Sequence, residues 1–400
     1  MRLKALVVAT AAALLAGTAI AQEIPIKIGV LNDRSGTYAD LSGEGSVVAA
    51  RMAVEDFGAE AKGIKVEIVS ADHQNKPDIA SNIARQWIDE AGVDVIADVP
   101  TSSAALAVHE VVREKNKIFL ISGAAASDLT GAKCSPNSVH WTYDTWALAH
   151  GTGSAMVKQG GDTWFFLTAD YAFGHALERD TAAVVEAAGG RVLGAVKHPF
   201  PGQDFSSFLL QAQGSGAKVI GLANAGADTT NAIKQAHEFG ITQAGQNLAG
   251  LLIFITDVNA LGLETAQGLV MTEAFYWDLN DQTRAWSTRF AERHGGAKPT
   301  MVQAGVYSSV LHYLKAVQAA ASKDPAAVMA RMKETPTDDP LFGKGEVRQD
   351  GRHVHDMYLF QVKAPADSKG PWDYYKVLAT IPAAEAFRPL AEGGCPLVKQ

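Results

Sequence analysis

Cysteine is scarce in this sequence of 400 residues, which contains only Cys134 and Cys395. Two thiols are too few for a thiolate zinc site, and they exclude the class of small secreted domains held together by several disulfides. In an oxidising compartment two lone cysteines usually pair. We therefore predict a Cys134–Cys395 disulfide that ties the end of the chain to its first third. Two separate thiols are the alternative.

The sequence also lacks any basic run of five or more residues. Its formal net charge is −8, and the loss of Arg2 and Lys4 with a leader segment would make it −10. An acidic chain without a basic cluster is a poor match for nucleic acid or for anionic lipid. We expect neither as a partner.

Long apolar runs are missing except at the N-terminus. There Arg2 and Lys4 precede an apolar run from Ala5 to Ile20, and Ala19-Ile20-Ala21 has the small-x-small pattern of a cleavage site. The pattern predicts a signal peptide over residues 1–21, cleaved after Ala21, and export to the periplasm. A retained membrane anchor is the alternative, but the run is shorter than the ~20 apolar residues that a span needs.

Catalytic motifs are absent as well. The sequence has neither a Gly-x-Ser-x-Gly elbow nor His-Glu-x-x-His, and its 36–45 stretch lacks the spacing and the lysine of a phosphate loop. His353 and His355 share one strand face but have no third metal ligand in view. Asp170 and His175 have no nucleophile beside them. We expect no catalytic residue, no metal and no cofactor.

The sequence does contain a repeated alternation of strand and helix patterns. Buried strands are predicted at 26–31, 65–70, 93–97 and 117–122, with amphipathic helices between them. A second series of strands is predicted at 163–168, 192–196, 219–223, 248–253 and 268–272. Alternating strands and helices are typical of parallel sheets covered on both faces. Two such series predict two α/β lobes.

The last third of the chain has a different pattern. Two long helices are predicted at 283–293 and 302–321 without a strand between them. An antiparallel strand pair is predicted at 355–362 and 372–378, because alternate residues there are apolar.

Candidate binding residues lie in loops that follow strands, where ligands of doubly wound sheets bind. Three consecutive hydroxyl residues, Thr101, Ser102 and Ser103, open a predicted helix, where free N–H groups and the helix dipole favour a carboxylate. Ordinary N-capping is the alternative. Ala124 and Ala125 lie in a small-residue loop that lets a ligand approach the backbone, and close helix packing is the alternative there.

Other strand-to-helix loops contain aromatic and amide side chains. Tyr38 and Phe173 are the aromatic residues that we expect against a flat ligand. Asn224 and Phe254 follow two further strands. Packing between the lobes is the alternative role for an aromatic cluster at the expected junction: Trp141, Tyr143 and Trp146.

Several short motifs follow one another in a specific order. They are Ile28-Gly29-Val30 with Ser35-Gly36, Asp72, Thr101-Ser102-Ser103, Ser122-Gly123-Ala124 with Asp128-Leu129-Thr130, Asp170-Tyr171-x-Phe173-Gly174, Asp204-Phe205-Ser206 and Gly268-Leu269. Each is weak alone. Together they resemble the periplasmic binding proteins of ABC importers in the leucine/isoleucine/valine-binding class, over nearly all of the chain after the leader.

The resemblance implies an α/β type I periplasmic binding protein fold, in which two doubly wound parallel-sheet lobes, joined by three crossover strands, close around a ligand. It places the crossings near Tyr143, Glu273 and Val347. The implied parts are a first lobe at 22–143 plus 273–347, a second lobe at 144–272 plus 348–380, and a tail at 381–400.

The resemblance also suggests how a ligand is held. Amino-acid binders of this class hold the ligand carboxylate at positions that correspond to Thr101, Ser102 and the 124–125 stretch. They hold the α-ammonium with an acid in a segment aligned with residues 250–254, where Leu252 replaces the acid. A buried ammonium without a counter-charge costs on the order of several kcal/mol.

Two further positions depart from the amino-acid binders: Ala125 replaces a threonine and Phe173 replaces a tyrosine. We therefore expect an apolar or aromatic carboxylate of the benzoate, hydroxybenzoate or coumarate type. The sequence is similar to the subgroup associated with uptake of such lignin-derived acids.

The resemblance implies ABC permease subunits of the inner membrane as partners, and we expect the binding protein to be a monomer. Two alternatives remain. One is a binding protein for a branched-chain amino acid or a short amide. The other, from a different functional class, is a ligand-sensing receptor subunit with the same fold.

Overall fold

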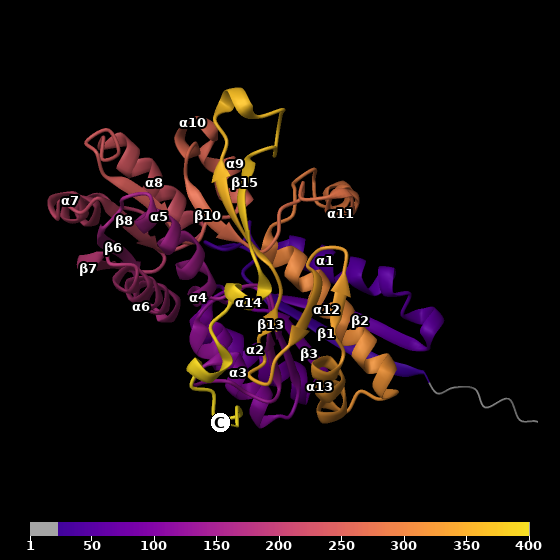
Figure 1. Cartoon of the computed structure of the whole chain (residues 1–400). Coiled ribbons are helices and arrows are strands. Elements are labelled where there is room, and N and C mark those ends of the chain that lie inside the picture. The colour runs from indigo at the N-terminus through magenta and orange to yellow at the C-terminus, as the bar shows by residue number, and fades with distance from the viewer. Residues whose placement is uncertain (1–22, 400) are drawn as a thin grey trace, which may run out of the picture.

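The structure is a computed structural model that describes residues 23–399 (Figure 1). The predicted signal peptide and its cleavage site after Ala21 lie outside the described residues. Across residues 23–399, no helix has both the length and the hydropathy needed to cross a membrane.

The first lobe is built on a five-stranded parallel sheet in the order β2-β1-β3-β4-β5. Its strands are β1 (Ile24–Asn32), β2 (Ile64–Asp72), β3 (Val95–Asp98), β4 (Ile118–Ile121) and β5 (Ser138–His140). The connecting helices are α1 (Gly43–Phe57), α2 (Pro77–Asp89) and α3 (Ser102–Glu114). Every residue of β3 and β4 is buried, as expected of central strands with helices on both faces.

The second lobe repeats this arrangement with a four-stranded parallel sheet in the order β7-β6-β8-β9. Its strands are β6 (Thr163–Ala169), β7 (Arg191–His198), β8 (Val219–Ala223) and β9 (Asn247–Gly250). Its helices are α4 (Thr145–Leu148), α5 (Ser154–Lys158), α6 (Ala172–Ala187), α7 (Ser206–Gly214), α8 (Ala227–Glu238), α9 (Ile255–Leu261) and α10 (Leu263–Ala266). The predicted α/β architecture of two parallel-sheet lobes is confirmed.

A separate antiparallel sheet, β10-β14-β15, completes the second lobe. It consists of β10 (Val270–Glu273), β14 (Met357–Val362) and β15 (Tyr375–Ile381). The predicted antiparallel pair of the last third is confirmed as β14 and β15, which lie side by side in Figure 1.

The two predicted long helices return to the first lobe as α11 (Asp281–Arg293) and α12 (Met301–Ala320), followed by α13 (Pro325–Glu334). Helix α12 packs along α1 (Figure 1). The Tyr307 hydroxyl of α12 donates a hydrogen bond to Asp56 of α1 at 2.8 Å.

The third crossing between the lobes is predicted near Val347, where the structure has a short hairpin. Strand β12 (Gly343–Val347) pairs antiparallel with β11 (Thr337–Asp339) and with β13 (His353–Val354). The backbone of Arg352 also forms an isolated parallel β-bridge with His140 of β5. These pairings join the hairpin around Val347 to the sheet of the first lobe.

The C-terminal tail returns to the first lobe. Cys134 and Cys395 form a disulfide with a Cα–Cα distance of 5.7 Å, as predicted. In the tail, the Arg388 guanidinium donates to the carbonyl oxygen of Ser127 at 3.2 Å, and the Arg388 carbonyl accepts from Arg348 at 2.9 Å. Covalent and polar contacts therefore both hold the tail.

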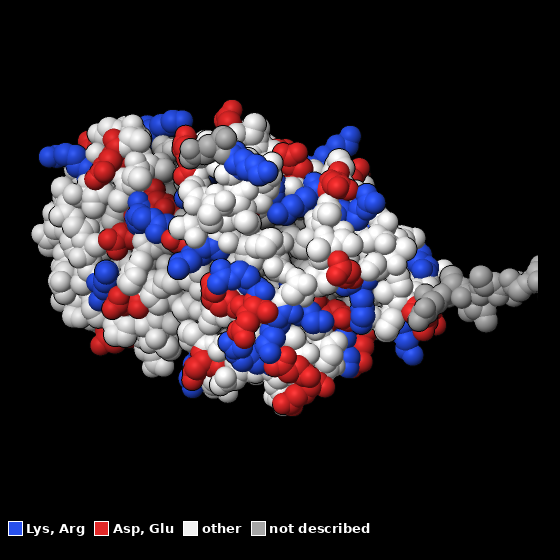
Figure 2. All heavy atoms as spheres, turned by 90° about the horizontal axis from the view of Figure 1, so that it is seen from below, with Lys and Arg blue, Asp and Glu red and all other residues white. Residues whose placement is uncertain are grey.

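Surface charge is mixed in sign on the face drawn in Figure 2, where basic and acidic side chains alternate. Exposed pairs such as Arg85–Glu114 and Lys115–Asp89 lie 2.9 Å apart. Such alternation weakens the electrostatic field above this face.

We predict that Cys395→Ser lowers the free energy of unfolding by about 2–4 kcal/mol, because a native disulfide restricts the unfolded chain. Thermal unfolding with and without a reductant measures this change. Ligand affinity should stay nearly constant. Counting thiols in the denatured, non-reduced wild type should give none, and two free thiols would refute the pairing.

Candidate ligand-binding site

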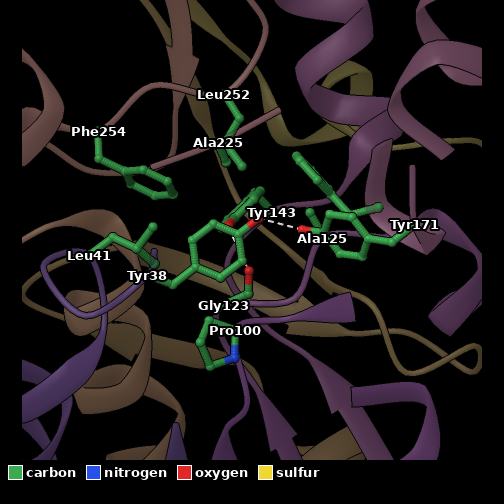
Figure 3. Close-up of a pocket in the computed structure, with 11 residues that line it drawn as sticks. Tyr38, Leu41, Pro100, Gly123, Ala125, Tyr143, Tyr171, Ala225, Leu252 and Phe254 are labelled. Carbon is green, nitrogen blue, oxygen red and sulfur yellow. Dashed lines mark hydrogen bonds between the residues drawn. The ribbon is translucent and has the colours of Figure 1, made fainter. Parts of the chain in front are cut away.

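A pocket lies between the lobes, where the carboxyl ends of the two parallel sheets face each other. About 220 Å³ of space, part of it open to solvent, is enclosed by loops that follow β1, β3, β4, β5, β6, β8 and β9. The first lobe and its crossing contribute Tyr38, Leu41, Pro100, Gly123, Ala125 and Tyr143. The second lobe contributes Tyr171, Phe173, Ala225, Leu252 and Phe254 (Figure 3).

The pocket lining is apolar and uncharged. Among the described residues that form it there is no acid, base or histidine, and its only polar side-chain groups are three tyrosine hydroxyls. Small-molecule sites commonly combine such a lining with a few polar groups. Such a lining suits a small and mainly apolar ligand.

One pair of tyrosine hydroxyls connects the two lobes, and the third bonds within the first lobe. Tyr38 and Tyr171 share a hydrogen bond across the cleft, and Tyr143 donates to the Gly123 carbonyl oxygen at 2.6 Å (Figure 3). Phe200 stacks on Tyr171, with ring centroids 4.4 Å apart, and lies 5.4 Å from Tyr38. Burial raises the pKa of Tyr38 and of Tyr143 well above its ordinary value, so both stay neutral donors.

The turn formed by Thr101, Ser102 and Ser103 lies directly behind Pro100 and does not line the pocket. Thr101 donates from its hydroxyl to the side-chain oxygen of Asn75. The Ser102 oxygen accepts from the backbone N–H groups of Ala125 and Ala126, at 3.2 Å each. These hydroxyls therefore join three segments of the first lobe to one another.

The start of α3 nevertheless keeps its free N–H groups. No described side chain caps this helix, since the Thr101 hydroxyl bonds to Asn75 instead. Uncapped first-turn N–H groups carry partial positive charge and attract anions. Pro100, the residue before the helix N-cap, lines the pocket.

Asp33 fixes the loop that carries Tyr38. Its buried carboxylate accepts from the backbone N–H groups of Gly36 and Tyr38 at 2.8 Å each, and from the Asn75 amide. Asn75, which has a left-handed φ of 58°, thereby links this loop to Thr101. Asn75 was not identified from the sequence, where its only signal was its place after β2.

Asp98 supports the turn that leads into Pro100. It is fully buried and accepts from the Ser42 hydroxyl at 2.7 Å and the Asn32 amide at 3.2 Å, while its second oxygen has no partner among the described residues. Burial raises the pKa of Asp98 to about 6. Asp98 and Val99 have φ of 81° and 54°, so the turn is strained.

In the second lobe, Asn224 lies beside the pocket and bonds within its own lobe. Its amide donates to His198 at 3.1 Å, and its oxygen accepts from the Thr229 hydroxyl at 2.7 Å. Its neighbour Ala225 lines the pocket. Leu252 is only 2% exposed and occupies the position at which the resemblance leads us to expect an acid.

The structure thus divides the predicted site residues into two groups. Those that line the pocket are Tyr38, Ala125, Phe173, Leu252 and Phe254. Those that lie behind or beside it are Thr101, Ser102, Ser103, Ala124 and Asn224. Six lining residues were not selected from the sequence: Leu41, Pro100, Gly123, Tyr143, Tyr171 and Ala225. Most of the six adjoin a selected residue or belong to a quoted motif.

Other candidates lie outside the pocket. Trp141 stacks on His353 with ring centroids 4.0 Å apart, and Trp146 stacks on His150 at 4.7 Å. The rings of His353 and His355 bond to backbone carbonyl oxygens. In the described part of the chain, no group of three or more acidic, histidine or cysteine side chains could hold a metal ion.

A family model described as periplasmic binding protein matches residues 25–371. The chain belongs to this family. Its members are non-catalytic substrate-binding proteins, so this protein is the substrate-binding component of an ABC transporter. It binds a small molecule and works with a membrane permease, and its family implies a periplasmic location.

Three solved structures illustrate the similarity. A periplasmic binding protein from Burkholderia mallei is 55% identical, with a TM-score of 0.91, over 94% of this chain and 99% of that one. A branched chain amino acid ABC transporter periplasmic ligand-binding protein from Burkholderia xenovorans LB400 is 43% identical, with a TM-score of 0.83, over 93% and 99%. A solute-binding protein from R. palustris, in complex with benzoate, is 22% identical, with a TM-score of 0.81, over 93% and 99%, and shares the fold.

We predict that Asp98→Asn reduces the pH dependence of stability. The pKa of Asp98 in the folded protein, about 6, exceeds the ordinary value of 3.8. The stabilisation from its protonated form is therefore complete below about pH 4 and is lost as the pH rises through 6. Two pKa units correspond to ~3 kcal/mol.

Denaturant unfolding of wild type and variant at pH 4 and pH 8 tests this. The amide that replaces the carboxyl group in the variant cannot ionise, and it keeps an oxygen for Ser42. The wild type should therefore lose more stability than Asp98→Asn between the two pH values. Equal losses would show that Asp98 does not titrate in this range.

Proposed function

We propose that this protein captures a small apolar monocarboxylate, in the first place an aromatic acid of the benzoate, hydroxybenzoate or coumarate type, and delivers it to an ABC permease. The observation that carries the proposal is Leu252 in an uncharged pocket lining. A ligand with an amine would find no counter-charge there.

The position of the nearby acids supports this choice. Asp257 accepts from the Phe254 N–H at 2.9 Å and does not line the pocket, and burial raises its pKa to about 7. An α-ammonium would therefore lose its hydration without gaining a carboxylate partner, at a cost on the order of several kcal/mol.

A carboxylate, by contrast, is compatible with the neutral donors at the pocket. The Tyr38 and Tyr171 hydroxyls face it, and the uncapped N-terminus of α3 begins behind Pro100. Hydrogen bonds from N–H or O–H groups to an anion are stronger than those between neutral groups. Such donors stabilise an acid without a lysine or arginine.

The aromatic lining supports a planar ligand. Phe173, Phe254 and the tyrosines supply ring faces and edges for stacking. The R. palustris protein shows that the same fold accommodates benzoate in another protein.

A branched-chain amino acid is the second candidate. It is favoured by the similarity to the Burkholderia xenovorans protein, a ligand-binding protein of a branched chain amino acid ABC transporter. The aliphatic residues Leu41 and Leu252 of the lining would pack against a leucine side chain. The two candidate ligands differ in one group: leucine carries an α-amine, and the aromatic acids do not.

Isothermal titration with a matched ligand pair separates the candidates. We expect 4-hydroxybenzoate, benzoate or p-coumarate to bind at least tenfold more tightly than leucine. We also expect 4-methylpentanoate, which is leucine without its amine, to bind more tightly than leucine. Leucine binding tighter than 4-methylpentanoate would refute the proposal.

Leu252→Glu tests the position directly. A carboxylate placed in the apolar pocket should weaken binding of an aromatic acid by at least ~2 kcal/mol, since the two negative charges repel and both are desolvated. Leu252→Met is the control, because it keeps the volume and the apolar character. If both variants bind the acid like the wild type, Leu252 does not contact the ligand.

A further inference from the structure

The two lobes also touch outside the pocket, through backbone atoms. The N–H of Ala227, at the start of α8, donates to the carbonyl oxygen of Thr37 in the loop after β1, at 3.3 Å. Thr37 precedes Tyr38, whose hydroxyl bonds to Tyr171. This contact therefore belongs to the same junction as the tyrosine pair but does not involve the pocket lining.

Gly226 makes the approach of the two backbones possible. Its φ of 59° and ψ of −137° belong to a region that side-chain-bearing residues rarely adopt. A Cβ at this position would lie 2.5 Å from the Thr37 carbonyl oxygen and 3.0 Å from the Tyr38 ring. Any other residue would hold the lobes apart at this point.

We propose that Gly226 and Ala227 of the second lobe, with Thr37 of the first, form a closure contact that determines ligand affinity without touching the ligand. Gly226 is a positioning residue, because it acts through the distance between the lobes. Apparent affinity is the affinity of the closed form multiplied by the fraction of molecules that can close. The inference holds for any ligand captured between the lobes.

Two variants remove the closure contact in different ways. Gly226→Ala adds a methyl group that meets the Thr37 carbonyl oxygen and the Tyr38 ring of the pocket lining, whereas the second variant leaves the lining untouched. Ala227→Pro removes the N–H donor, and it suits the local structure because Ala227 is the first residue of α8, where proline is favoured. If Gly226→Ala is too unstable to study, Ala227→Pro still tests the contact.

Gly262→Ala is the matched control. Gly262 has a φ of 76° and a ψ of 152°, which also favour glycine. No described atom lies within 4 Å of a Cβ built there. This variant reproduces the backbone strain of Gly226→Ala without the collision between lobes.

Closure can be measured without a ligand by cross-linking. The pair Thr37→Cys and Ala227→Cys keeps the backbone atoms of the contact, and the native cysteines are already paired. We expect this pair to form a disulfide in the otherwise wild-type protein and with Gly262→Ala, and to form it at least tenfold more slowly with Gly226→Ala. Equal rates, or no cross-link in either background, would overturn the proposal.

Titration then relates closure to affinity. Both 4-hydroxybenzoate and leucine are tested on each single variant. The ligand that the wild type binds should bind at least tenfold more weakly to Gly226→Ala and to Ala227→Pro. Its affinity for Gly262→Ala should stay within twofold of that for the wild type. Unchanged affinity in Gly226→Ala would overturn the inference. Failure of the wild type to bind the aromatic acid would instead refute the proposed ligand class, and the cross-linking result would still stand.

Discussion

Gly123 lies so close to the turn after β3 that a methyl group in its place would come within 2.7 Å of the Pro100 Cα. This close approach of one backbone segment to another lets the loops after β3 and β4 form one continuous wall of the pocket. The Tyr143 hydroxyl then bonds to the Gly123 carbonyl. The first-lobe half of the pocket depends on this contact, because a larger residue at position 123 would push the two loops apart.

Buried polar groups hold this wall in place. Asp33, Asn75 and Thr101 form a chain of hydrogen bonds from the Tyr38 loop to the start of α3, and Ser102 extends it to the loop after β4. Buried polar groups rigidify a structure when each has a partner. As a result, the residues behind the pocket are polar and fixed, while the surface that meets a ligand is apolar.

Much of the fold was predictable from the sequence, because strands and helices have different apolar periodicities and ligands of doubly wound sheets bind after strands. Tyr38, Phe173 and Phe254 were selected on that ground, and all three line the pocket. The direction of a side chain was not predictable in this way. Thr101 follows a strand too, but its hydroxyl turns toward Asn75, a residue brought there by tertiary structure.

The tail gives the two lobes an additional connection. The chain leaves the second lobe at the end of β15 and is joined to the first lobe at Cys134. Together with the three crossings, the disulfide-bonded tail makes a fourth covalent connection between the lobes. This connection exists only where thiols are oxidised. Protein made in a reducing cytoplasm would therefore be mechanically different from the exported protein. Its lobes would be linked covalently by the three crossings alone, and the tail would be held by noncovalent contacts.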